Sequence, residues 1–294
     1  MNEPHARASA QVVGLKSAAG FLQVCLGVAV ILTITAVSRP PAAAAPVAVR
    51  FPEGITHGFL VVRSAGGEVV GQGELTQTVK EGGVVESRLV FNFKDGSLHD
   101  EKVAFSQQRV LTLIRYQLVQ RGPSFPQQMD VTIDRGTSRY QVRSRARDDG
   151  KEQVLSGDVD LPNDAYNGML VTTLMNLPKG ASETVNVLAF TPEPNAVALD
   201  LVFVGEQTVR IGDQSRKASQ YAFKPDIGTI TKFLGKVLGK LPSDFHYDCY
   251  ILADEVPGFV RFKGPLQLMG PVLTIELLSP RLPGKTEEQK EASK

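Results

Sequence analysis

From His57 onward, apolar and polar residues alternate with a period of two or form short β-branched runs, which is the pattern of strands. Glycine and aspartate end most of these runs, as at Ala65-Gly66-Gly67 and Lys94-Asp95-Gly96, and they tolerate the positive φ of hairpin turns. Consecutive hairpins predict an antiparallel meander. The predicted strands are 57–64, 68–81, 84–94, 98–107, 109–121, 128–134, 138–148, 151–160, 184–191, 196–204, 207–212, 216–224, 245–254, 258–267 and 270–278.

Two segments have a helical rather than an alternating pattern. Apolar residues between Ala165 and Leu177 recur at helical spacing before Pro178, and Asp164 is a candidate N-cap. The segment 227–240 has one apolar stripe that includes Phe233, Leu234 and Leu238, with lysines elsewhere on its surface. We interpret it as a helix that packs on the sheet, and a movable lid or a membrane-surface helix is the alternative.

The pattern as a whole predicts a mainly β fold. A sheet of this many strands must curl or split, so we expect a large curved antiparallel sheet or incomplete barrel over 57–278, with two short helices against its concave side. The alternative is two sub-lobes, 57–160 and 184–278, joined by the intervening connector.

The N-terminal region has the features of an export signal. Phe21 to Val37 form 17 residues without a charge, basic residues precede them, and a run of alanines follows at 42–45. We interpret 1–44 as a cleaved signal peptide, with an uncleaved anchor as the alternative, and 45–56 as a linker. Because of this export signal, the protein is expected in the periplasm or outside the cell. The polar segment 279–294 is predicted to be a disordered tail.

The numbers of basic and acidic residues are nearly equal, so the chain has no strong overall electrostatic field that could recruit a charged partner. The whole chain has 32 basic and 31 acidic residues. Residues 1–44 hold Arg7, Lys16, Arg39 and Glu3, so the remainder has 29 basic and 30 acidic residues and a formal charge of −1. We therefore expect no nucleic-acid partner, and membrane contact only through the N-terminal segment or the 227–240 helix.

No catalytic or metal-binding motif stands out after the export signal. His57, His99 and His246 lie at no metal-ligand spacing, so we expect no metal, no cofactor and no enzymatic activity. His246 and Cys249 fall on opposite faces of a regular strand, which argues against a nucleophilic pair and favours a buried thiol. Asp95, Asp100 and Glu101 surround a turn without the spacing of a calcium loop, and we interpret them as a solvated hairpin tip.

Four arginines form the most distinctive polar pattern of the chain. Within 139–147, alternation places Arg139, Arg143, Arg145 and Arg147 on one face of a strand. A solvent-exposed sheet face is the simpler interpretation, since glutamates such as Glu152 are near. The functional alternative is a contact surface for phosphate or carboxylate groups.

The connector between the two runs of strands carries a resemblance. Leu161-Pro162-Asn163-Asp164-Ala165-Tyr166-Asn167-Gly168-Met169, followed by Leu174-Met175-Asn176-Leu177-Pro178, resembles a pattern of uncharacterised secreted bacterial envelope proteins with long antiparallel sheets. Those proteins are similar to lipid-handling proteins of the lipoprotein-carrier type, whose incomplete barrel encloses an apolar cavity beneath helices. The resemblance implies an architecture and no site residues, and this chain departs from the carriers in length.

Three function classes follow from these observations. The first is a non-catalytic envelope protein that binds a lipid-like amphiphile in the concavity of the sheet, through Phe233, Leu234 and Leu238 or through the arginines. The second is a structural or assembly partner of an envelope protein, acting through sheet edges or the arginine face. An enzyme is the third and least favoured class.

We predict that export removes the N-terminal segment after Ala44. Small residues at Ala42 and Ala44 suit signal peptidase, whereas Pro46 would block a cut after Ala45. N-terminal sequencing of exported protein should therefore begin at Ala45. Recovery of intact Phe21 to Val37 would establish the anchor instead.

Overall fold

The computed structural model describes residues 46–146, 150–190, 193–211, 213–226, 246–267 and 270–278. The chain divides into two compact units, 1–42 and 43–294. The first unit lies outside the described residues, as do the predicted tail 279–294 and the predicted helix 227–240.

The described residues form fourteen strands, one α-helix and one short 3₁₀ helix. The bounds are β1 Thr56–Ser64, β2 Val69–Lys80, η1 Glu81–Gly83, β3 Val84–Phe93, β4 Leu98–Ser106, β5 Thr112–Arg121, β6 Gln127–Asp134, β7 Arg139–Ala146, β8 Glu152–Asp158, α1 Leu170–Asn176, β9 Glu183–Phe190, β10 Pro194–Ile211, β11 Gln214–Pro225, β12 Tyr247–Leu252, β13 Phe259–Gly264 and β14 Leu273–Leu277.

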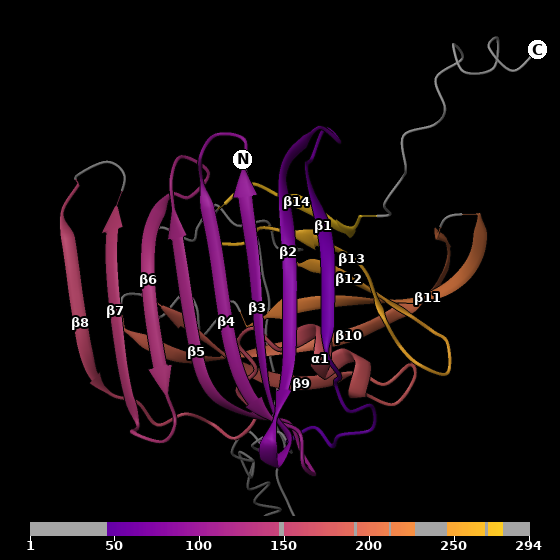
Figure 1. Cartoon of the computed structure of the whole chain (residues 1–294), viewed down its shortest axis with the longest axis horizontal. Coiled ribbons are helices and arrows are strands. Elements are labelled where there is room, and N and C mark those ends of the chain that lie inside the picture. Colours follow the sequence, from indigo (N-terminus) through magenta and orange to yellow (C-terminus); the bar gives the residue numbers. More distant parts are fainter. Residues whose placement is uncertain are drawn as a thin grey trace, which may run out of the picture. The chain divides into compact units, whose positions relative to one another are not determined.

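All fourteen described strands belong to one antiparallel sheet. Its order is β8-β7-β6-β5-β4-β3-β2-β1-β14-β13-β12-β11-β10-β9 (Figure 1). Strands that are consecutive in sequence therefore pair with each other, except β8 and β9, which form the two edges, and β1 pairs with β14. The pairing joins the two predicted sub-lobes into a single sheet, whose described edges are β8 and β9.

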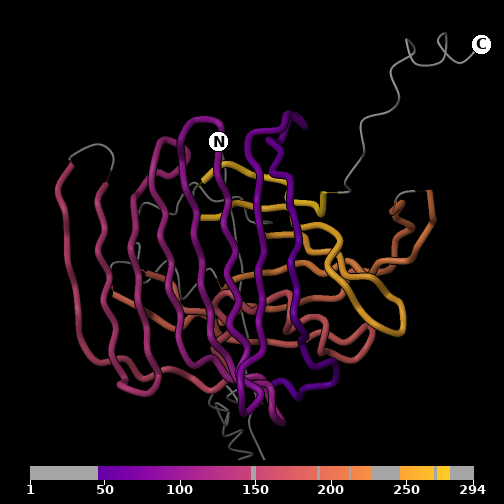
Figure 2. Tube along the Cα trace, in the orientation of Figure 1, coloured from indigo at the N-terminus to yellow at the C-terminus, as the bar shows by residue number. Residues whose placement is uncertain are grey.

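The sheet folds back on itself so that its two halves form layers. Figures 1 and 2 show β1–β8 in front and β9–β13 crossing behind them. Alternate side chains of both halves meet in a main buried cluster. Its members include Val103, Phe105, Leu113, Tyr116, Val131, Ile133 and Val142 from β4–β7, and Val185, Leu188, Leu199, Leu201, Tyr221, Phe223, Cys249 and Ile251 from β9–β12.

A second apolar cluster fills the corner at which β1 meets β14. Leu60 and Val62 of β1 face Leu273 and Ile275 of β14, together with Phe91, Phe93 and Phe125. Burial of these side chains stabilises the pairing of the first strand with the last, since apolar burial contributes about 25 cal/mol per Å².

Most predicted strands are confirmed with small shifts of their ends. The predicted strands 196–204 and 207–212 are one strand, β10, which continues across an irregularity between Phe203 and Gly205. Glycine turns are confirmed where expected, for example at Gly67 with φ 85° and Gly96 with φ 82°.

The prediction of two short helices is confirmed only in part, because α1 is the single α-helix of the described residues. It is shorter than the predicted segment 165–177, and Met169 rather than Asp164 is its N-cap. Gly168 has φ 69°, a left-handed conformation that interrupts a right-handed helix. The Asp164 carboxylate instead accepts a hydrogen bond from Asn186 of β9 at 2.7 Å.

Residues 46–53, in the segment that we interpret as a linker, are held by the body of the fold. The Val47 amide donates to the Tyr166 hydroxyl at 2.7 Å, and the amides of Arg50 and Phe51 donate to the Asn176 side chain at 2.7 and 2.8 Å. The Glu53 carboxylate accepts bonds from Thr172 of α1 and Gln77 of β2. Residues 46–53 thereby tie α1 to the end of β2 near Gln77.

We predict that Gly73→Ala destabilises the corner cluster. A Cβ at Gly73 would lie 2.4 Å from ring carbons of Phe91, which is fully buried. Forcing a methyl group into such packing costs about 1–3 kcal/mol. Urea unfolding should show this loss, while Gly54→Ala, with nothing within 4 Å, serves as the control. An unchanged midpoint in Gly73→Ala would contradict this account of the corner.

Candidate functional site

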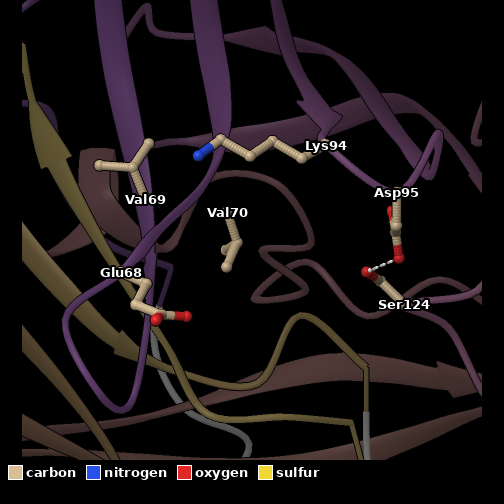
Figure 3. A pocket seen from close by; sticks show the side chains of 6 residues that line it. All are labelled: Glu68, Val69, Val70, Lys94, Asp95 and Ser124. Atoms are coloured by element: carbon tan, nitrogen blue, oxygen red, sulfur yellow. Dashed lines mark hydrogen bonds between the residues drawn. The ribbon is translucent and has the colours of Figure 1, made fainter.

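A cleft of about 540 Å³ lies where three connections of the front layer meet. The β1–β2 turn, the β3–β4 turn and the β5–β6 connection contribute its walls. Figure 3 shows the six lining side chains, which are Glu68, Val69, Val70, Lys94, Asp95 and Ser124. The volume is in the range of small-molecule sites.

One wall of the cleft is fixed by a hydrogen-bonded group. The Ser124 hydroxyl donates to Asp95 Oδ2 at 2.7 Å, and the Ser97 amide donates to Asp95 Oδ1 at 2.9 Å. The Ser97 hydroxyl accepts from the Ser124 amide at 2.8 Å. Desolvation raises the pKa of Asp95, but the bonds from Ser124 and Ser97 outweigh it and lower the pKa below its ordinary value. The β3–β4 and β5–β6 connections are therefore locked together.

The remaining lining combines apolar surface with two charges of opposite sign. Val70 packs against the corner cluster, so the apolar floor is continuous with the core. Lys94 extends from the β3–β4 turn toward the side formed by Val69, and Glu68 lies across from it (Figure 3). Neither Lys94 nor Glu68 has an ion-pair partner among the described residues.

His99 lies buried in the corner cluster next to the cleft. Its ring is 5.5 Å from Phe91 and 6.4 Å from Phe125, centroid to centroid. The Gln120 amide nitrogen, which can only donate, lies 3.1 Å from His99 Nδ1. The neutral ring therefore carries its proton on Nε2, which has no partner among the described residues. Desolvation lowers the pKa of His99 to about 4, and the charge of Asp100 only partly opposes it.

A second buried polar group joins the two layers. The Tyr116 hydroxyl donates to Glu101 at 2.8 Å, and the Tyr116 ring stacks on Phe190 of β9. Desolvation raises the pKa of Glu101, and the bond from Tyr116 opposes this shift. Desolvation and the adjacent Glu101 raise the pKa of Tyr116 well above its usual value. The Glu101 carboxyl therefore points into the interface between the two layers and does not line the cleft.

A smaller hollow of about 320 Å³ lies beside Arg135. The Arg135 guanidinium donates to the carbonyls of Leu113, Leu161 and Pro162 at 2.6–2.8 Å. Its donors are directed at the backbone of the β8–α1 connection, so it holds that connection in place and is a poor ligand-binding group.

Arg139, Arg143 and Arg145 lie on the outer face of β7, as the alternation of the sequence predicts. Arg139 forms an ion pair with Asp158 at 3.4 Å, and Arg143 and Arg145 share Glu152 at 3.3 and 3.1 Å. These carboxylates belong to β8, so each described arginine has a local partner, as expected for a solvated sheet face. Arg147 lies outside the described residues, as do Phe233, Leu234 and Leu238.

The other polar candidates do not converge. Cys249 is buried, and desolvation strongly raises the pKa of its thiol, whereas His246 lies on the opposite face 3.8 Å from Asp248. Asp95 belongs to the cleft wall, while Asp100 bonds to Arg88 on the outer face. Glu101 faces inward, so these three acids form no common site. No group of three or more metal-binding side chains occurs among the described residues.

The cleft was not predicted from the sequence. Its lining residues come from the β1–β2 turn with the start of β2, the β3–β4 turn and the β5–β6 connection, and none belongs to a motif. Only the hairpin glycines at Gly67 and Gly96 indicated that turns lie there. Their spatial grouping depends on the sheet topology.

Comparison with family models, curated proteins and solved structures finds no match to this chain. Across the part of the chain that the structure describes, no helix is both long enough and apolar enough to cross a bilayer.

We predict that His99 makes the fold sensitive to mild acid. Its pKa is about 4 in the folded protein and 6.5 for an ordinary histidine, so between these values the unfolded state binds more protons. Stability must then fall as pH drops from about 6.5 toward 4. At 1.36 kcal/mol per pKa unit, the shift from 6.5 to about 4 corresponds to about 3 kcal/mol.

His99→Phe should remove this contribution while the ring still packs between Phe91 and Phe125. Denaturant unfolding at pH 7 and pH 4.5 measures the difference, with His57→Gln as the control because His57 is exposed on the outer face. A variant that loses as much stability in acid as the wild type would refute the assignment to His99.

Proposed function

We propose that this chain is an exported, non-catalytic protein that binds a small amphiphile in the cleft between Lys94 and Glu68. The observation that carries the proposal is the cleft itself, in which an apolar floor continuous with the core lies between two opposite charges. The export assignment rests on the N-terminal sequence pattern.

The chemistry of the lining favours a ligand with a charged head and an aliphatic part. Val69 and Val70 are half-buried and offer apolar contact. Lys94 is suited to a phosphate or carboxylate, and Glu68 to a cationic group. A zwitterionic head would engage both charges, whereas a purely anionic head would be attracted by Lys94 and repelled by Glu68.

The location of the cleft supports a binding role at the rim of the sheet. The space between the layers holds fully buried side chains such as Val131, Ile133 and Leu201. A ligand that entered there would have to displace this packing, at a cost of several kcal/mol. The rim cleft offers apolar contact without that cost.

The locked wall supports binding without large rearrangement. The Asp95, Ser97 and Ser124 hydrogen bonds hold two of the three connections together. A site formed in advance loses less conformational entropy when a ligand binds.

Single-chain amphiphiles below their micelle concentration provide the test. We expect the exported protein to bind dodecylphosphocholine and laurate, measured by titration calorimetry. Lys94→Gln should weaken both by about fivefold, since an exposed charge pair contributes up to about 1 kcal/mol. Glu68→Gln should weaken the phosphocholine but strengthen laurate, because only the former presents a cation.

The control is Lys224→Gln, an exposed lysine on β11 away from the cleft. Val69→Thr keeps the shape of the side chain but adds a hydroxyl, and it should weaken both probes. The proposal is wrong if neither probe binds, or if binding is the same in Lys94→Gln, Glu68→Gln and Val69→Thr as in the wild type.

A further inference from the structure

The two edges of the sheet differ in how their backbone groups are satisfied. Along β9, the Tyr166 amide donates to the Asn186 carbonyl at 2.9 Å, and the Asn186 amide donates to the Asp164 carbonyl at 3.0 Å. The Asn167 side chain bonds the amide and carbonyl of Leu188 at 2.7 and 3.0 Å. The β8–α1 connection therefore covers the edge of β9.

No such cover lies along β8 within the described residues. Val159 donates to the Ser138 carbonyl at 2.9 Å, which marks a hydrogen-bonded pair between β8 and β7. Hydrogen-bonded pairs alternate in an antiparallel ladder, so residues 157, 155 and 153 also bond to β7. The backbone groups of residues 152, 154, 156 and 158 then point away from the sheet. They form an open edge.

The side chains on this edge do not block pairing. Val154 is 50% exposed and lies in the middle of the strand. The flanking acids Glu152 and Asp158 are drawn toward the arginines of β7, which lowers the repulsion that edge charges normally supply. An open edge with an exposed valine is a template for another strand.

We propose that two copies of this chain pair antiparallel through their β8 edges, with Val154 against Val154 of the partner subunit. A two-fold axis at Val154 places residue 154 of each subunit opposite its copy. The N–H and C=O groups of both residues point out of their own sheets, so they can form the hydrogen bonds of an antiparallel ladder. It places Glu152 opposite Ser156 of the partner subunit and brings no like charges into direct opposition. An axis at Leu155 would instead place Glu152 opposite Asp158 of the partner subunit, and repulsion disfavours it.

The self-pairing extends the sheet across two subunits and satisfies the edge of each. Because one strand from each subunit contributes, we expect a weak, concentration-dependent dimer rather than an obligate one. The proposal is independent of the cleft, since β8 contributes no residue to it.

The first test is sedimentation equilibrium of the full-length chain in a non-ionic detergent. The wild type should dimerise as concentration rises, and Val154→Glu should raise the dissociation constant at least tenfold. Glu at 154 would face Arg143 within its own subunit, according to the register, so the monomer should stay folded. In the dimer the two carboxylates would oppose each other across the axis.

The matched control is Val204→Glu, which changes a valine that is 55% exposed on β10 and should leave the dimer intact. The second test reads the register directly. In Val154→Cys the two thiols would meet across a hydrogen-bonded pair, whose Cα separation of about 5.5 Å suits a disulfide. Mass spectrometry of the oxidised protein should find the 154–154 link, and Val204→Cys should give no equivalent.

A monomer at every soluble concentration overturns the proposal and leaves β8 to a strand of another protein. A dimer that withstands Val154→Glu, or one in which oxidised Val154→Cys shows no link at position 154, overturns it as well.

Discussion

The pairing of the first strand with the last is the constraint on which the rest of the structure depends. Every other pair of neighbouring strands is joined by a connection in the sequence, but β1 and β14 are joined only by hydrogen bonds and by the corner cluster. Without this pairing, β1–β8 and β9–β14 would be two meanders with an additional open edge each. Because Gly73 has no side chain, the ring of Phe91 can pack against its backbone at this corner. The corner therefore decides that there is one sheet and not two lobes.

Buried polar groups specify how the connections and layers fit together. Gln120 bonds both His99 and the Leu266 carbonyl, so it joins β5 to the β13–β14 connection. Tyr116 and Glu101 form a bond beside Phe190 of the opposite layer. An unmatched polar group in such a place costs about 1–3 kcal/mol. Alternative arrangements of the layers would leave these groups without partners, which favours a single arrangement.

The local pattern predicted the strands because alternation and turn glycines act over a few residues. It also predicted the exposed face of Arg139, Arg143 and Arg145, since a regular strand assigns faces by parity. It could not predict the β1–β14 pairing, which joins residues more than 200 positions apart in the chain.

Three further features differ in how far the local pattern could predict them. The cleft forms only where three turns come together. The arginines have partners because β8 lies beside β7, which the turn at 147–151 made predictable. The N-cap at Asp164 was wrong because Gly168 adopts a left-handed conformation and delays the start of α1. Parity and composition cannot show that conformation.

The two ends of the front strands have separate roles. The cleft lies at the end formed by the β1–β2 and β3–β4 turns. Residues 46–53 contact the other end, through Gln77 near the end of β2 and Gln107 after β4. Residues 46–53 are therefore held at the end of the front strands that lies opposite the cleft.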